Sequence, residues 1–250
     1  MGHRYQAASG GTPATSPGAD PAPDIRQGDS AAPIRAVIFD RDGTLLRFNY
    51  GAAEELERRV HAIAPTLPPA AASSHWMAWP GPWPRLVEEE PAFWRLFWQE
   101  FANRHALPPE ATARLLEIGD FYHTCFAAYP DARGCLEELR RRGLKLAVLT
   151  NFELPSIDRT LRYAGIDPSL FDVLLSSSAT GITKPDVRAY LGCAEALGLE
   201  PAACLFVDDR SDNVDGARRA GMRAVLIDRA GNAPPSEHAI RDLRQLCDLL

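Results

Sequence analysis

The chain has 250 residues, of which 46% are hydrophobic, and its formal net charge at pH 7 is −6. This length and composition allow one sizeable α/β domain, alone or with a smaller module, and exclude a chain too polar to bury a core. The negative charge and the dispersed basic residues argue against a nucleic acid partner. No apolar run approaches the length of a membrane span, and the N-terminus lacks a secretory signal, so we expect a cytoplasmic protein with no membrane partner.

Cysteine and lysine usage narrows the chemistry further. The five cysteines are odd in number and scattered, with no Cys-x-x-Cys pair, which predicts reduced thiols and neither disulfides nor a zinc site. Among the 27 basic residues only Lys145 and Lys184 are lysines. Any reaction that needs an ammonium group therefore has two candidates.

The N-terminal residues 1–32 are rich in Ala, Gly, Pro, Ser and Thr and contain almost no large hydrophobic side chains. A segment of this composition cannot offset its ordering entropy by burial. We therefore interpret it as a disordered tail.

Five short apolar runs, each bounded by polar or turn residues, predict buried strands. In chain order they are Arg35 to Phe39, Leu144 to Leu149, Phe171 to Leu175, Ala203 to Val207 and Arg223 to Ile227. Segments of helical spacing precede or separate the later runs, near Ala132 to Arg142, Pro155 to Ala164, Pro185 to Leu197 and Asn213 to Ala220. This alternation predicts an α/β fold with a doubly wound parallel sheet, whose ligands bind at the carboxyl ends of the strands.

The interval from Phe48 to Ala128 interrupts the alternation. It contains helical stretches separated by proline-rich breaks, no convincing strand, and all five tryptophans of the chain. We expect an inserted helical module here, so that the chain divides into a tail at 1–32, core residues 33–47, the module at 48–128 and the rest of the core at 129–250. Trp76, Trp79 or Trp83 could stack on a flat substrate, or they could pack the module.

The first predicted strand leads into the run Phe39-Asp40-Arg41-Asp42-Gly43-Thr44. An Asp-Gly pair after an apolar run can be only a tight turn. Alternatively, a carboxylate at a strand end can attack phosphorus and form an aspartyl phosphate, a role that fits Asp40. A second carboxylate two residues on can protonate the leaving oxygen and later activate water, a role that fits Asp42.

Polar groups also follow or precede the later strands, where a parallel sheet presents its ligands. Thr150 and Asn151 come directly after the second predicted strand, and Lys184 opens the segment before the fourth. The Thr150 hydroxyl and the Asn151 amide or backbone donors could hold phosphoryl oxygens, and Lys184 could neutralise the charge that develops during transfer.

Asp208 and Asp209 stand at the end of the fourth predicted strand. Carboxylates crowded against phosphoryl oxygens need positive charge, which Mg²⁺ supplies through oxygen ligands. We therefore expect Mg²⁺ as the cofactor, with Asp209 as the first choice among these two for a metal ligand and Asp208 in support.

These four groups of residues, in this order, resemble the four signature motifs of the haloacid dehalogenase (HAD) superfamily. The resemblance runs from about Arg35 to Asp228. It implies a Rossmann-like core with a helical cap inserted after the first strand. It also implies that Asp40 attacks, that Asp42 handles protons, and that Mg²⁺ contacts Asp40, the backbone carbonyl of Asp42 and the acid of the fourth motif, assigned here to Asp209.

The fourth motif departs from the pattern of many relatives, which carry Gly-Asp followed by Asn-Asp downstream. Here the run is Asp208-Asp209 with Asp212-Asn213 after it. Asp212 could belong to the site, or it could cap the following helix. Likewise, Arg41 and Arg47 could recognise an anion or only pair with neighbouring carboxylates.

The residues also bear on the reaction within this superfamily. Its dehalogenases lack the second aspartate because a leaving halide needs no proton, so Asp42 disfavours dehalogenation. Phosphonate-cleaving members need a cap lysine, and residues 48–128 contain none. A cap favours small substrates because it closes over them and excludes water.

We therefore expect a hydrolase, specifically an Mg²⁺-dependent phosphatase acting on a small phosphorylated metabolite as a monomer or homodimer. A phosphomutase of the same superfamily remains an alternative, since it would use the same core residues. A 2-haloacid dehalogenase and a catalytically inactive regulatory member are weaker alternatives.

Overall fold

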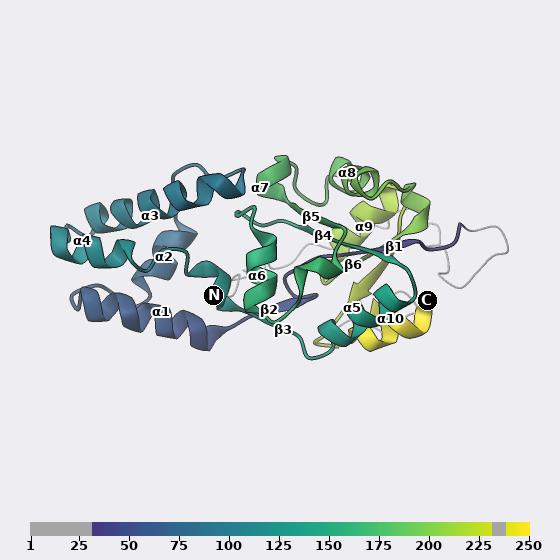
Figure 1. Cartoon of the computed structure of the whole chain (residues 1–250), viewed down its shortest axis with the longest axis horizontal. Coiled ribbons are helices and arrows are strands. Elements are labelled where there is room, and N and C mark those ends of the chain that lie inside the picture. The colour runs from purple at the N-terminus through teal and green to yellow at the C-terminus, as the bar shows by residue number, and fades with distance from the viewer. Residues whose placement is uncertain (1–31, 232–238) are drawn as a thin grey trace, which may run out of the picture.

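The structure is a computed structural model that describes residues 32–231 and 239–250 (Figure 1). The predicted tail at 1–32 lies outside these ranges except for its last residue. Within them, no helix combines the length and the apolar character needed to cross a membrane.

Six strands form one parallel sheet in the order β5-β4-β1-β6-β7-β8. Their bounds are β1 Ala36–Phe39, β4 Lys145–Thr150, β5 Val173–Ser176, β6 Cys204–Asp208, β7 Arg223–Ile227 and β8 Ala239–Ile240. This sheet confirms the predicted α/β class and its Rossmann-like, doubly wound topology. Because β1 lies between β4 and β6, its carboxyl end meets the ends of the two strands that carry the other predicted motifs.

Alternate side chains of the central strand face opposite layers of helices. Val37 and Phe39 belong to a hydrophobic cluster with the first layer, and Ala36 and Ile38 belong to a cluster with the second. The first layer holds α5 Ala132–Arg141, α6 Ile157–Tyr163 and α10 Leu243–Leu249. The second holds α8 Val187–Leu197 and α9 Ser211–Arg219. Shorter helical turns lie at η3 Pro168–Leu170, α7 Ser177–Thr180 and η4 Pro201–Ala203.

The remaining helices come from the interval that interrupts the alternation. They are α1 Tyr50–Ile63, α2 Ala71–Met77, η1 Val87–Glu89, α3 Glu90–Arg104, α4 Pro109–Leu116 and η2 Tyr122–Cys125. Figure 1 shows α1 to α4 gathered at one end of the long axis, with the six-stranded sheet at the other. We keep the division at residues 48 and 128 as a proposal and call residues 48–128 the cap.

The expectation of no strand between Phe48 and Ala128 is wrong at its edges. Two three-residue strands, β2 Leu46–Phe48 and β3 Phe126–Ala128, pair antiparallel where the chain enters and leaves the cap. Strands this short give no alternation to detect, and their partners lie about 80 residues apart in the sequence, beyond the reach of a local pattern.

A buried polar network also joins the cap to the core. Glu90, at the start of α3, accepts hydrogen bonds from the backbone N–H of Ser156 at 2.9 Å and from its hydroxyl at 2.7 Å. The imidazole of His123 lies 3.1 Å from the same hydroxyl through Nε2 and 2.7 Å from the Thr160 hydroxyl through Nδ1. All four residues are buried. Hydrogen bonds from His123 and Ser156 outweigh the effect of burial and lower the pKa of Glu90.

Candidate active site

Asp40 follows the last residue of β1 and is held at the centre of the sheet edge. Its backbone N–H donates to the carbonyl of Val207 in β6 at 2.8 Å, so the ladder between the strands continues to the site. The Lys184 ammonium donates to Asp40 Oδ1 at 2.6 Å and to Asp208 Oδ2 at 2.7 Å. The structure thus brings together three predicted site residues from three separate parts of the chain, and all three are buried.

Asn151 positions the backbone of Lys184. Its Oδ1 accepts the Lys184 N–H at 2.8 Å, and its Nδ2 donates to the Lys184 carbonyl at 2.9 Å. These two bonds leave one N–H of the side-chain amide free, and a phosphate-binding role for Asn151 stays a prediction. Thr150, the last residue of β4, is buried beside the end of β1.

Asp208 is surrounded by donors. Besides Lys184, the side-chain amide of Asn213 reaches both carboxylate oxygens at 3.1 and 3.0 Å, and the backbone N–H of Arg210 donates to Oδ1 at 2.9 Å. Asp212 lies outside this arrangement, because its exposed carboxylate accepts the Arg210 guanidinium at 2.7 Å. Asn213, which the sequence interpretation assigned no role, is thus the residue of α9 that completes the site.

Asp40, Asp208 and Asp209 each place a carboxylate oxygen within 4.8 Å of the others. The Lys184 ammonium pairs with two of these three carboxylates, so the ionised group carries more negative than positive charge. Hard divalent cations such as Mg²⁺ prefer oxygen ligands of this kind. The donor set therefore fits the predicted cofactor.

Gly43 allows Asp209 to approach the loop that follows the nucleophile. Its φ of +77° is in the left-handed region, and a Cβ at this position would lie 2.1 Å from Asp209 Oδ2. Any side chain at position 43 would have to displace the Asp209 carboxylate. The first motif therefore needs glycine here so that Asp209, in the fourth motif, can keep its position.

The crowding of carboxylates shifts their pKa values. Burial raises the pKa of Asp40 to about 7, with Asp208 and Asp42 adding to the rise and Lys184 opposing it. Removal of water around Asp209 and the charge of Asp208 raise the pKa of Asp209 to about 6, although the residue reaches the surface. Burial would lower the pKa of Lys184, but the two neighbouring carboxylates outweigh it and raise it. A bound cation would favour the ionised carboxylates and reverse the upward shifts.

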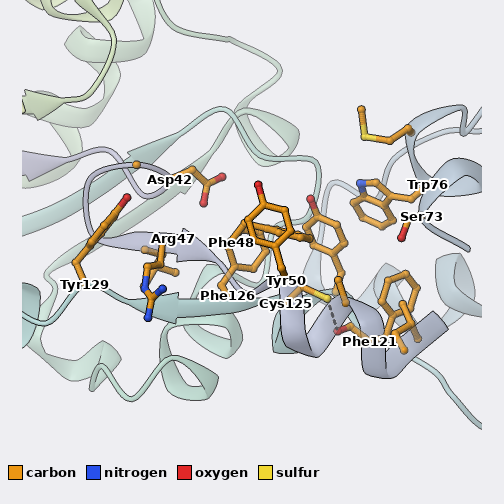
Figure 2. Close-up of a pocket in the computed structure, with 16 residues that line it drawn as sticks. Asp42, Arg47, Phe48, Tyr50, Ser73, Trp76, Phe121, Cys125, Phe126 and Tyr129 are labelled. Carbon is orange, nitrogen blue, oxygen red and sulfur yellow. Dashed lines mark hydrogen bonds between the residues drawn. The ribbon is translucent and has the colours of Figure 1, made fainter. Parts of the chain in front are cut away.

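Asp42 lines a cavity, together with the residues drawn in Figure 2. Its two oxygens accept hydrogen bonds from Arg41 Nε at 2.9 Å and Nη2 at 2.7 Å. The Arg41 side chain is fully buried, with its guanidinium 3.4 Å from the centre of the Phe152 ring and 4.4 Å from that of Phe126. Of the two alternatives for Arg41, pairing with a neighbouring carboxylate is the one that the structure bears out.

Arg229 braces the loop that carries Asp42. Its guanidinium donates to the carbonyls of Gly43 at 3.2 Å and Thr44 at 2.6 Å, and it also pairs with Asp131 at 3.0 Å. The sequence offered no signal for this contact, because Arg229 follows β7 and lies more than 180 residues from the loop.

The cavity beside Asp42 has a volume of about 540 Å³ and lies between the core loop and the cap. Its lining, drawn in Figure 2, comes from the loop after β1, from β2, α1, α2 and η2, and from β3 with the residues next to it. Asp42 and Gly43 place one end of this cavity at the loop that follows Asp40.

The tryptophans of the cap pack against one another and against neighbouring rings. Trp76 is stacked on Tyr122 at 4.0 Å and on Trp94 at 5.6 Å between ring centres, with interplanar angles of 16° and 20°. Trp79 and Trp83 pack around Phe93 and do not line the cavity. Packing, the second of the two alternatives, thus accounts for Trp79 and Trp83, whereas Trp76 both packs against its neighbours and lines the cavity.

The fold and the carboxylate cluster place the chain among α/β enzymes that work at the carboxyl ends of a parallel sheet. Within that class, residues 34–221 match the family model described as haloacid dehalogenase-like hydrolase. The chain therefore belongs to this family and is a hydrolase.

Individual relatives have different activities in their names. Phosphatase MT3486 of Mycobacterium tuberculosis (strain CDC 1551 / Oshkosh) is 41% identical over 220 residues, which cover 87% of this chain and 97% of that protein. A phosphoserine phosphatase of Thermus thermophilus is 36% identical, with 84% of this chain and 95% of the relative covered. The crystal structure of a 2-haloacid dehalogenase from Pseudomonas syringae pv. Tomato DC3000 has a TM-score of 0.63 and 24% identity, over 86% of this chain and 97% of that one, and shows the fold alone.

Proposed function

We propose that this hydrolase is an Mg²⁺-dependent phosphatase that cleaves the phosphate monoester of a small metabolite through an aspartyl phosphate on Asp40. The observation that carries the proposal is the carboxylate of Asp42, which lies two residues from the nucleophile and faces the cavity. An alcohol leaving group needs a proton and a halide does not, so a carboxyl group at this place suits ester cleavage. The similarity to the mycobacterial protein named as a phosphatase supports the same activity.

The first half of the reaction uses the cluster around Asp40. Lys184 holds Oδ1 at 2.6 Å, which leaves Oδ2 for in-line attack on phosphorus. As the bond to phosphorus forms, Asp42 donates a proton to the ester oxygen, and the alcohol departs into the cavity. Mg²⁺ bound by Asp40 and Asp209, with the backbone carbonyl of Asp42 and with Asp208 in support, would supply positive charge for the phosphoryl oxygens.

In the second half, Asp42 accepts a proton from a water molecule that attacks the aspartyl phosphate, which releases inorganic phosphate and restores Asp40. Arg41 fixes the orientation of the carboxylate through both of its oxygens. Lys184 and the Thr150 hydroxyl are the candidates to stabilise the phosphoryl group during both transfers.

The proposal is tested by assaying purified protein with p-nitrophenyl phosphate, with EDTA and then with added Mg²⁺. We expect hydrolysis that EDTA abolishes and Mg²⁺ restores, and no turnover by Asp40→Asn that folds like the wild type. Turnover that survives either change would overturn the proposal. Isomerisation of a sugar phosphate without release of inorganic phosphate would instead assign a phosphomutase.

A further inference from the structure

We infer that the substrate is a phosphate monoester whose alcohol carries a flat apolar group, such as an arylalkyl chain, and is neither a sugar phosphate nor phosphoserine. This inference rests on the proposed phosphatase activity and names the substrate class for it. The cavity of about 540 Å³ beside Asp42 is the feature from which it is drawn.

The cavity is placed to receive the leaving group. Asp42 and Gly43, from the loop that follows the nucleophile, form one end of its lining. The proton donor for the ester oxygen must lie within hydrogen-bond reach of that oxygen. The carbon skeleton attached to the oxygen therefore extends from Asp42 into this cavity, and the lining decides which alcohols it accepts.

Apolar and aromatic side chains make up most of the wall. Six of the largest are Leu46, Phe48, Leu56, Trp76, Phe121 and Phe126. Contact with such a wall favours an alcohol in proportion to the apolar area that it removes from water. A volume of this size accommodates an aromatic ring together with the short chain that joins it to the phosphate.

Several polar groups of the wall already have partners. The hydroxyl of Ser73 donates to Glu57 at 2.6 Å, and the Cys125 thiol lies 3.9 Å from the carbonyl of Phe121. Asp42 is the only carboxylate among the described lining residues, and Arg41 already engages it. The ammonium group of phosphoserine would thus find no second acid in the described lining, where Arg47 could match only its carboxylate.

A sugar would be matched no better. Each hydroxyl that leaves water needs a donor or acceptor in exchange, and an unpaired one is costly. The phenol groups of Tyr50, Tyr122 and Tyr129 are the remaining hydroxyl partners in the described lining, and Tyr50 is 61% exposed at its rim.

The experiment compares kcat/KM for 2-phenylethyl phosphate, glycerol 3-phosphate and O-phosphoserine, all esters of primary alcohols. Because all three leaving groups are primary alcohols, differences in kcat/KM reflect mainly how well each alcohol fits the cavity. Burial of one aromatic ring predicts that 2-phenylethyl phosphate is favoured by roughly 10- to 100-fold. A preference for either polar ester would overturn the inference while leaving the phosphatase intact. Failure to release phosphate from every ester, p-nitrophenyl phosphate included, would instead overturn the proposed function.

A cavity-filling variant adds a second test. Ala53, in α1, lines the cavity, and Ala53→Phe should lower kcat/KM for 2-phenylethyl phosphate by about tenfold, but that for ethyl phosphate by no more than about twofold. Ala62→Phe is the matched control, because Ala62 lies on the same helix, exposed and outside this cavity. Equal losses for both esters would contradict the inference.

If Ala53→Phe does not fold, product inhibition of the wild-type enzyme tests the inference instead. We expect 2-phenylethanol to inhibit at a concentration at least about tenfold below that of glycerol, for the same hydrophobic reason. Equal inhibition by the two alcohols would overturn the inference.

Discussion

The contact between Gly43 and Asp209 makes Gly43→Ala a specific test of the carboxylate cluster. The added Cβ would lie 2.1 Å from Asp209 Oδ2 and 2.5 Å from its Cγ, well inside van der Waals contact. The Asp209 carboxylate must therefore shift from its present place beside Asp40 and Asp208. Displacing a group that helps to hold a metal costs about 10- to 100-fold in metal affinity or activity. We expect the Mg²⁺ concentration for half-maximal hydrolysis of p-nitrophenyl phosphate to rise by about that factor.

Gly43→Ala also places alanine at a φ of +77°, which costs about 1–2 kcal/mol whatever surrounds it. Gly143→Ala is the matched control, since Gly143 has a φ of +79° and no atom within 4 Å of the added Cβ. Both variants should lose similar stability in urea unfolding, but only Gly43→Ala should change the Mg²⁺ titration. If Gly43→Ala keeps the wild-type Mg²⁺ dependence, or if Gly143→Ala shifts it equally, the assignment of Asp209 to the metal is refuted.

Three further predictions concern Asp42 and the charged groups around Asp40. Asp42→Asn should lower kcat for an alkyl phosphate by about 10²–10⁴-fold and for p-nitrophenyl phosphate by less, because nitrophenolate leaves without a proton; equal losses would contradict the acid role. Lys184→Met leaves two buried carboxylates without their cation and should cost about 3–5 kcal/mol in urea unfolding, while Lys145→Met, at the only other lysine, stays within about 1 kcal/mol. The raised pKa of Asp40, about 7, means that the metal-free fold binds a proton that the unfolded chain releases near pH 4, so this contribution to stability is lost as pH rises toward 7. Mg²⁺ should therefore raise the melting temperature more at pH 8 than at pH 5, and an equal rise at both would refute the coupling.

Much of the sheet could be predicted because each strand is a separate apolar run with polar residues at its end. The run from Arg223 to Ile227 forms β7 with the same bounds, and the other predicted strands lie within two residues of the observed ones. Parallel topology then places the ends of neighbouring strands side by side, so the proximity of Asp40 and Asp208 could be predicted from the local pattern and this one rule. Lys184 reaches both carboxylates from the loop before α8.

What escaped prediction depends on contacts between distant segments. The side-chain amide of Asn151 turns to the backbone of Lys184, and Arg229 reaches back to the loop after β1. The local sequence does not predict the hydrogen-bond partner of either side chain, because these partners come close only when the chain is folded. The stacking of Arg41 on Phe152 depends likewise on a residue more than 100 positions away.

The buried network of Glu90, His123, Ser156 and Thr160 ties the start of α3 and η2 to the residues around the start of α6. If the whole cap rotated away from the core about β2 and β3, Glu90 would lose its hydrogen bonds to Ser156. These buried groups would then have to be hydrated. The network therefore opposes a rigid-body opening of the cap. Tyr50, an exposed residue of the cavity lining, marks a side of the cavity that solvent reaches without such an opening.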